Sequence, residues 1–225
     1  MYKRLGILGG MGPLATYTLY KNIIESTPVQ KDQDHINMVI LNASYIPDRT
    51  EGILRGSSCE SPLPHLLNGI KTLENAGCDL IAVPCNTSHY FYDEMQNSCK
   101  IKILNMIDLT AEKLESLGIN QEQIYLMATE GTIKTGVYQK YLSKRNIKII
   151  SPSDQEINEM MRVIYEVKAG KIPDISGLEE IAENHGELIV LGCTELSTLD
   201  FKNIKYIDAM EVLKDQILEL FGKKK

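Results

Sequence analysis

The sequence predicts an α/β fold built from two similar lobes, each a mostly parallel sheet flanked by helices. Short apolar runs alternate with longer stretches of helical pattern along the 225 residues, and this alternation is typical of α/β proteins. Most of the runs are apolar throughout, as expected for parallel strands that helices cover on both faces. The same features also recur in the same order in the two halves of the chain.

The apolar runs define eight expected strands. They lie at Leu5–Gly9, Ile36–Leu41, Leu80–Val83, Ile101–Leu104, Ile124–Ala128, Ile147–Ile150, Leu188–Leu191 and Lys205–Ile207. Helix ends are recognisable between them. Pro13 suits a first helical turn, and Ser153 with Glu156 forms a capping-box pattern ahead of a helix over Ile157–Lys168 that Gly170 should end.

Three features occur in the same order in both halves. A turn with glycine follows a strand at 9–12 and 129–132, and a cysteine stands in a small polar turn at 84–87 and 192–195. A strand ending in Ile-Asp is expected at Ile107–Asp108 and at Ile207–Asp208. This order predicts one lobe over 1–105 and another over 106–210, with a helix in 211–225 that packs back on the first lobe. The alternative is chance similarity between βα units.

Composition excludes several classes of protein. A net charge of −6 disfavours nucleic-acid binding, which needs Lys and Arg to neutralise phosphates. No run approaches the ~18 apolar residues of a membrane helix, and residues 1–4 enter a strand without an apolar leader; we therefore expect a cytoplasmic protein. Five cysteines without a C-x-x-C pair fit neither a disulfide scaffold nor a zinc site, so no metal is expected.

The glycine turn after the first strand allows two interpretations. Residues 10–15 fit G-x-G-x-x-A, the dinucleotide fingerprint. However, the next strand ends at 41–44 without the carboxylate that would hold a ribose. A more general interpretation is an anion site made by backbone N–H groups at a helix N-terminus.

Cys85 and Cys193 differ in placement from the other three cysteines. Each follows an apolar strand, at the carboxyl end where α/β folds bind ligands. Either one alone is more often a small buried hydrophobe. Two such cysteines facing each other across a cleft could instead invert a carbon centre: one thiolate removes a proton and the other thiol delivers one to the opposite face.

Three segments carry a family resemblance. Residues 6–13, 84–89 and 191–196 resemble the signatures of the cofactor-independent aspartate/glutamate racemase family, with the aspartate racemase branch most similar. Residues 45–50 and 128–132, with Tyr138 following, are also similar. The resemblance implies two pseudo-symmetric lobes with the active site between them, commonly a homodimer, and neither pyridoxal phosphate nor any other cofactor.

The resemblance also implies roles for individual residues. Cys85 and Cys193 would be the acid/base pair, while His89 and Glu195 would orient or tune the thiols. The amino-acid substrate would contact Met11, Gly12, Arg49, Asn86, Thr87, Thr129, Thr132, Lys168 and Thr194. Of these, Arg49 and Lys168 match a side-chain carboxylate, which guanidinium binds as a bidentate fork.

Other interpretations of these residues and of the whole chain stay open. Without the family, Arg49 could be a solvated loop charge, and Lys168 could complement a helix dipole. The leading hypothesis is a racemase that interconverts L- and D-aspartate, with glutamate also possible. The alternatives are a decarboxylase or cis–trans isomerase of the same superfamily, a dinucleotide-binding oxidoreductase, and a non-catalytic amino-acid-binding protein.

Overall fold

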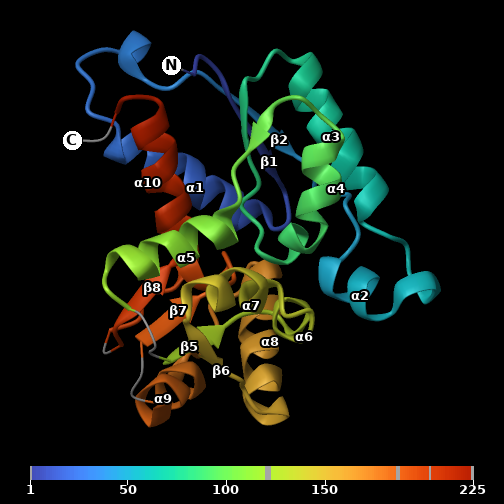
Figure 1. The fold of residues 1–225 in the computed structure, drawn as a ribbon, viewed down its shortest axis with the longest axis vertical. Coiled ribbons are helices and arrows are strands. Elements are labelled where there is room, and N and C mark those ends of the chain that lie inside the picture. Colours follow the sequence, from blue (N-terminus) through green and yellow to red (C-terminus); the bar gives the residue numbers. More distant parts are fainter. Residues whose placement is uncertain (1, 120–122, 186–187, 203, 224–225) are drawn as a thin grey trace.

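The computed structural model describes residues 2–119, 123–185, 188–202 and 204–223, and within them two four-stranded sheets lie one above the other (Figure 1). The first sheet has the order β2-β1-β3-β4 and the second β6-β5-β7-β8, with all neighbouring strands parallel. The strands are β1 (Leu5–Gly9), β2 (Met38–Asn42), β3 (Leu80–Ala82), β4 (Lys102–Ile103), β5 (Gln123–Met127), β6 (Lys148–Ile150), β7 (Leu188–Leu191) and β8 (Tyr206–Asp208). The predicted fold class is therefore confirmed, and the two lobes share one strand order.

Helices cover the sheets. They are α1 (Pro13–Ser26), α2 (Arg49–Leu54), α3 (Leu63–Asn75), α4 (Tyr92–Asn97), α5 (Met106–Ser116), α6 (Glu130–Lys134), α7 (Val137–Leu142), α8 (Asp154–Lys168), α9 (Ser176–His185) and α10 (Ala209–Leu220). Short 3₁₀ helices lie at η1 (Asp32–Asp34), η2 (Gly56–Ser58), η3 (Thr87–Phe91), η4 (Ser143–Arg145) and η5 (Leu196–Thr198).

The local signals in the sequence account for most element ends. Helix α8 begins with the predicted capping box, in which the Ser153 side chain accepts from the Glu156 N–H and Glu156 reaches back to the Ser153 N–H. Gly170 adopts the left-handed φ of 73° just after the helix, where glycine is favoured. Each of the eight expected strands is present, with ends that move by no more than two residues.

One predicted feature of the repeat is wrong. Ile107–Asp108 does not end a strand, because it lies in the first turn of α5. The side chain of Asn105 caps that helix by accepting from the N–H groups of both residues, and Asp208 caps α10 by accepting from the Met210 N–H. The element that repeats is therefore a helix-capping residue at the end of the fourth strand of each lobe. Asn105 lies two residues after β4, and Asp208 is the last residue of β8.

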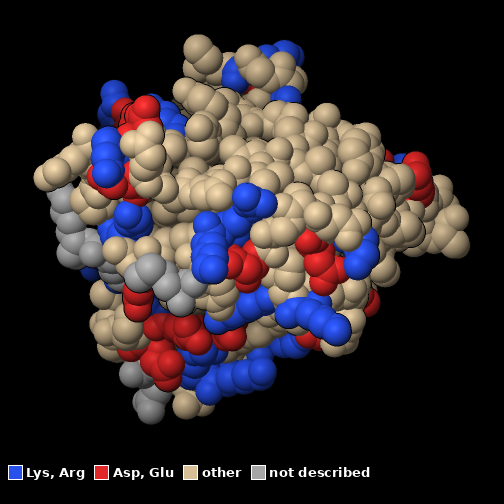
Figure 2. Space-filling model, turned by 90° about the horizontal axis from the view of Figure 1, so that it is seen from above, with Lys and Arg blue, Asp and Glu red and all other residues tan. Residues whose placement is uncertain are grey.

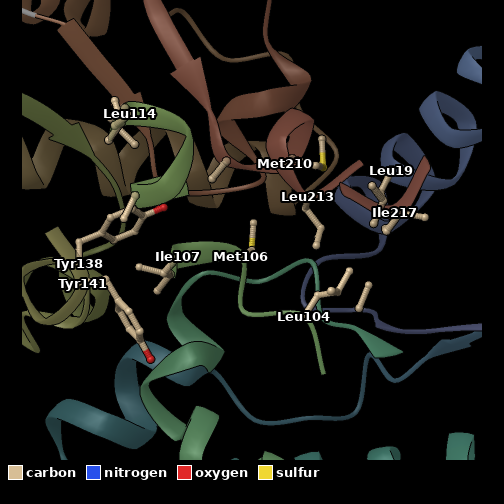
Figure 3. Close-up of a cluster of buried hydrophobic side chains, with 14 of the residues drawn as sticks. Leu19, Leu104, Met106, Ile107, Leu114, Tyr138, Tyr141, Met210, Leu213 and Ile217 are labelled. Atoms are coloured by element: carbon tan, nitrogen blue, oxygen red, sulfur yellow. The ribbon is translucent and has the colours of Figure 1, made fainter. Parts of the chain in front are cut away.

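A shared hydrophobic core joins the two lobes. Side chains of α1, α5, α7 and α10 meet between the sheets, with Met106, Tyr138 and Leu213 fully buried among them (Figure 3). Separate clusters fill the far side of each sheet, under α3 in the first lobe and under α8 and α9 in the second. Because one core serves both sheets, the lobes hold each other in a fixed orientation.

Helix α10 packs against α1 and α5; the division of the chain at residues 105 and 210 stays a prediction. No helix among the described residues has the length and apolar character needed to cross a bilayer. On the face that Figure 2 shows, Lys and Arg side chains alternate with Asp and Glu, and a wide area carries few charges.

Candidate active site

A pocket lies between the lobes at the carboxyl ends of strands from both sheets. Its empty space is about 250 Å³, open solvent at its mouth included. Met11 follows β1, Cys85 follows β3, Thr129 follows β5 and Cys193 follows β7, as expected for ligand sites in parallel sheets. The full lining is Met11, Asp48, Arg49, Thr50, Cys85, Asn86, Thr87, Thr129, Lys168, Cys193, Thr194 and Glu195.

The turn that carries Cys85 is held by His89. The Met106 N–H donates to His89 Nε2 over 3.2 Å, so we place the imidazole proton on Nδ1, which then donates to the Cys85 carbonyl over 2.9 Å. Complete burial lowers the pKa of His89, which keeps the ring neutral. His89 therefore fixes the backbone of Cys85 and does not line the pocket.

Arg49 is buried beside Cys85 at the start of α2, with only 7% of its surface exposed. Nη1 donates to the carbonyls of Ile46 and Pro47, and Nη2 donates to that of Met11 over 3.0 Å. Nε is buried without an acceptor. Burial alone would lower the pKa of Arg49, but attraction to Cys85 and Asp48 and a hydrogen bond to Cys85 raise it. Arg49 is therefore a fixed cation, not a solvated loop charge.

Cys193 lies against a carboxylate. Its Sγ–H donates to Glu195 Oε2 over 3.1 Å, while Glu195 Oε1 accepts from the Gly12 N–H of the other lobe over 2.8 Å. Burial, followed by the negative charge of Glu195, raises the pKa of Cys193 well above its usual range, although Lys168 opposes the shift. Cys193 is accordingly held as a thiol.

Lys168, the last residue of α8, brings a second cation to the pocket. Its Nζ lies 3.5 Å from Asp48 Oδ2 of the first lobe. Burial lowers the pKa of Lys168, but the neighbouring Glu195 and Cys193 together raise it by more, so the net shift of the pKa is upward. The pocket thus contains two cations, and they come from different lobes.

Asn86 and Thr194 flank the two cysteines and differ in how their polar groups are used. Asn86 Oδ1 accepts from the Tyr138 hydroxyl over 2.6 Å, whereas Asn86 Nδ2 is buried without an acceptor. The Thr194 hydroxyl donates to the Pro84 carbonyl of the other lobe over 3.1 Å. Asn86 Nδ2 and Arg49 Nε are therefore two buried donors at the pocket with no acceptor among the residues that the structure describes.

Three threonine hydroxyls meet at the junction of the lobes. Thr87 Oγ1 lies 2.9 Å from Thr129 Oγ1 and 3.0 Å from Thr132 Oγ1, and Thr129 Oγ1 donates to Thr132 Oγ1 over 3.0 Å. Thr87 and Thr129 line the pocket, whereas Thr132 is fully buried behind them. Gly12 also lies outside the lining, so three of the predicted site residues, His89, Thr132 and Gly12, act on the site only through neighbours.

The glycine turn after β1 packs against protein and leaves no open phosphate site. Gly10 has φ of +89°, and a Cβ there would come within 2.6 Å of the backbone at Ala43 and Ser44. The Gly12 N–H, which the sequence predicts to bind an anion, is already bonded to Glu195. No observation at this turn favours a dinucleotide.

Two pocket residues were not predicted from the sequence. Asp48 and Thr50 line the pocket on either side of Arg49. Asp48 caps α2 by accepting from the Glu51 N–H over 3.0 Å, so the pattern Asp-x-x-Glu was a signal for its helix cap. Its contact with Lys168 comes from the other lobe and has no local signal.

The strand order and paired thiols define a two-lobed α/β protein with a cysteine-lined site between its lobes. The family model for Asp/Glu/hydantoin racemases matches residues 8–216, and the chain belongs to this family. It is 25% identical over 211 residues to the broad specificity amino-acid racemase RacX of Bacillus subtilis (strain 168), covering 87% of this chain and 86% of that protein.

Solved structures of other proteins are similar to this one over nearly the whole chain. An aspartate racemase of Picrophilus torridus is 35% identical with a TM-score of 0.87, covering 99% of this chain and 95% of the other. An aspartate racemase homologue from Pyrococcus horikoshii OT3 is 26% identical with a TM-score of 0.75, covering 98% and 99%. The predictions of the family and of an amino-acid racemase are thus confirmed.

Proposed function

We propose that the protein interconverts L- and D-aspartate through a two-base mechanism with Cys85 and Cys193. The observation that carries this proposal is one pocket between the lobes that combines both thiols with two buried donors, Arg49 Nε and Asn86 Nδ2, which lack an acceptor among the described residues. Unpaired buried donors cost free energy unless a ligand supplies the acceptor. A dicarboxylic amino acid would supply acceptors to both donors.

The two thiols have different starting roles. A two-base mechanism needs one thiolate to take the α-proton and one thiol to donate to the opposite face. Because burial and Glu195 hold Cys193 as a thiol, Cys193 is the acid in the first turnover and Cys85, beside Arg49, is the base. The reverse direction needs the exchanged state, with the proton on Cys85 and the thiolate at Cys193.

The choice of an acidic substrate rests on Arg49 and Lys168. Backbone carbonyls use three N–H groups of Arg49 and Cys85 takes a further hydrogen bond, while the buried Nε–H has no acceptor among the described residues and can donate to a carboxylate. A guanidinium fixed in this way is preorganised, so little side-chain entropy is lost when the carboxylate binds. The Picrophilus torridus relative is described as an aspartate racemase, which supports aspartate ahead of glutamate.

The remaining site residues would hold the α-amino-acid part of the substrate. We assign Asn86, Thr87, Thr129 and Thr194 to the α-carboxylate and the amine, with Met11 forming the wall opposite. All five line the pocket. Charge that builds on the α-carboxylate as the proton leaves would be stabilised by Asn86 Nδ2, a buried donor that is fixed in place and has no other acceptor among the described residues.

The test is direct. Purified, reduced protein with L-aspartate and no added pyridoxal phosphate should form D-aspartate until the two enantiomers are equal, as followed by chiral chromatography. L-Glutamate and a neutral amino acid, assayed in parallel, define the substrate range. Binding of aspartate without any D-aspartate would contradict the proposal and favour a non-catalytic amino-acid-binding protein.

We further propose that the chain works as a homodimer in the cytoplasm. Tyr17, Tyr20 and Ile40 are large apolar residues with more than a third of their surface exposed, and all three line one shallow groove between α1 and β2. Such a surface is typical of protein contacts. Sedimentation equilibrium of the purified protein would give a mass of one chain if the homodimer proposal is wrong.

A further inference from the structure

The ring of hydroxyls formed by Thr87, Thr129 and Thr132 is complete and buried. Relative exposures are 5%, 3% and 0%, and the three oxygen–oxygen distances lie between 2.9 and 3.0 Å. Thr87 belongs to η3 of the first lobe, while Thr129 and Thr132 belong to the start of α6 in the second. The ring therefore bridges the lobes beside the pocket.

The protons of the ring can be counted. A threonine hydroxyl has one proton to donate and two lone pairs, so three hydroxyls with three mutual contacts each donate once. Because Thr129 donates to Thr132, Thr132 donates to Thr87 and Thr87 donates to Thr129. Thr129 also accepts from the Thr132 N–H over 3.2 Å, which fills its second lone pair.

In this arrangement only the Thr87 hydroxyl can turn its proton toward a ligand in the pocket. Thr132 lies outside the pocket lining, and Thr129 has its proton directed at Thr132. If Thr87 turns its proton from Thr129 toward an anionic ligand, the ring opens into a chain in which Thr129 donates to Thr132, Thr132 to Thr87, and Thr87 to the ligand. Each of the three hydroxyl protons is still donated in a hydrogen bond, and each hydrogen bond of the chain strengthens the following one by polarising it.

We propose that Thr132, which does not line the pocket, is a positioning residue that directs the Thr87 hydroxyl proton to the α-carboxylate of the substrate. This inference rests on the proposed function and adds a residue to it. As the α-proton leaves, negative charge grows on the α-carboxylate, so a donor at the end of a hydrogen-bonded chain is worth more in the transition state than in the bound substrate.

The test compares variants at Thr132 with a matched variant at Thr135, the C-cap residue of the same helix. Thr132→Val keeps the shape and removes the hydroxyl, while Thr132→Ser keeps the hydroxyl. Thr135→Val is the control, because the Thr135 hydroxyl contacts only backbone carbonyls here, that of Gly131 over 2.7 Å and that of Thr132 over 3.2 Å, and not the hydroxyl ring. The measurements are kcat and KM for aspartate racemisation, with thermal unfolding of each variant.

Thr132→Val should lower kcat by about tenfold with little change in KM, whereas Thr132→Ser and Thr135→Val should stay close to the wild type. If Thr132→Val does not fold, Thr132→Ala is measured in its place. A kcat for the hydroxyl-free variant equal to that of Thr135→Val, or a loss that Thr132→Ser does not restore, would overturn the inference. Failure of the proposed function is distinct, because the wild type would then make no D-aspartate.

Discussion

The two cysteine sites occupy equivalent places in the two lobes and have opposite surroundings. Cys85 follows the third strand of the first sheet, and Cys193 follows the third strand of the second. The guanidinium of Arg49 lies beside Cys85, whereas the carboxylate of Glu195 accepts the hydrogen bond of Cys193. The backbone is repeated, but the charge beside the sulfur is reversed.

This difference separates the contribution of the repeated backbone from that of the neighbouring side chains. The repeated strand order brings two thiols to the facing ends of two sheets, which a reaction on both faces of one carbon requires. The unequal charges make the two thiols inequivalent, because burial and the carboxylate of Glu195 raise the pKa of Cys193, whereas the neighbour of Cys85 is a guanidinium.

Removing either thiol should have the largest effect. Cys85→Ala and Cys193→Ala each delete one of the two bases, and we expect racemisation to fall by at least ~1,000-fold. Cys78→Ala is the control, because Cys78 is also buried but lies outside the pocket. Chiral chromatography of aspartate measures the rate. Substantial racemisation by either pocket variant would show that one base suffices.

Arg49→Lys should come next. A lysine keeps the positive charge but cannot make the three backbone hydrogen bonds of Arg49 and also donate to a carboxylate. We expect kcat/KM for aspartate to fall by about 100-fold. Arg55→Lys, at an exposed residue that pairs with Glu51, should leave it unchanged. If both variants behave alike, Arg49 does not contact the substrate.

Glu195→Gln tests the reversed charge directly. The amide can still accept from the Gly12 N–H, but the negative charge that raises the pKa of Cys193 is lost. A lower pKa means that Cys193 loses its proton at lower pH, so the alkaline limb of kcat/KM should move to lower pH. Glu130→Gln, at the surface pair with Lys134, should not move it. An unchanged limb would mean that Glu195 only holds the lobes together.

The smallest expected effect concerns the capping residues, which differ between the lobes as Asn105 and Asp208. Burial raises the pKa of Asp208 from 3.8 to about 6. Because the folded state holds this proton more tightly than the unfolded state, stability falls as pH rises through about 4 to 6. Asp208→Asn, which makes the two caps alike, should stabilise the protein by about 1–2 kcal/mol at pH 7.

At pH 4 the same variant should show little gain, since Asp208 is then protonated in the folded state. Chemical unfolding at the two pH values measures the difference. A gain of equal size at both would assign the effect to helix capping and not to the buried charge.

The sequence predicted those parts of the molecule that local patterns determine. Short, mostly apolar runs located all eight strands. The signal is strongest for central strands such as β1 and β3, which are fully buried. The Ser153 capping box located α8, and the position of Cys85 and Cys193 after strands placed them at one cleft. The Ile107–Asp108 error arose because Ile-Asp fits the end of a strand as well as the first turn of a helix.

Contacts between the lobes could not be predicted from local patterns in the sequence. Asp48 meets Lys168 across 120 positions of sequence, and no motif near either residue marks that pairing. The hydroxyl ring likewise joins Thr87 to two threonines of the other lobe. The resemblance named Thr132 as a substrate contact, whereas the structure puts it behind the pocket wall. Such relations come from the packing of one sheet on another.

The most direct test of the two-base account is the fate of the α-proton. L-Aspartate is incubated with the wild-type protein in D₂O, and the two enantiomers are separated early in the reaction and analysed by proton NMR and mass spectrometry. The account predicts that D-aspartate carries solvent deuterium at the α-carbon while the remaining L-aspartate keeps its proton. D-Aspartate that retains the original proton would contradict it, because one group would then have removed and returned the same hydrogen.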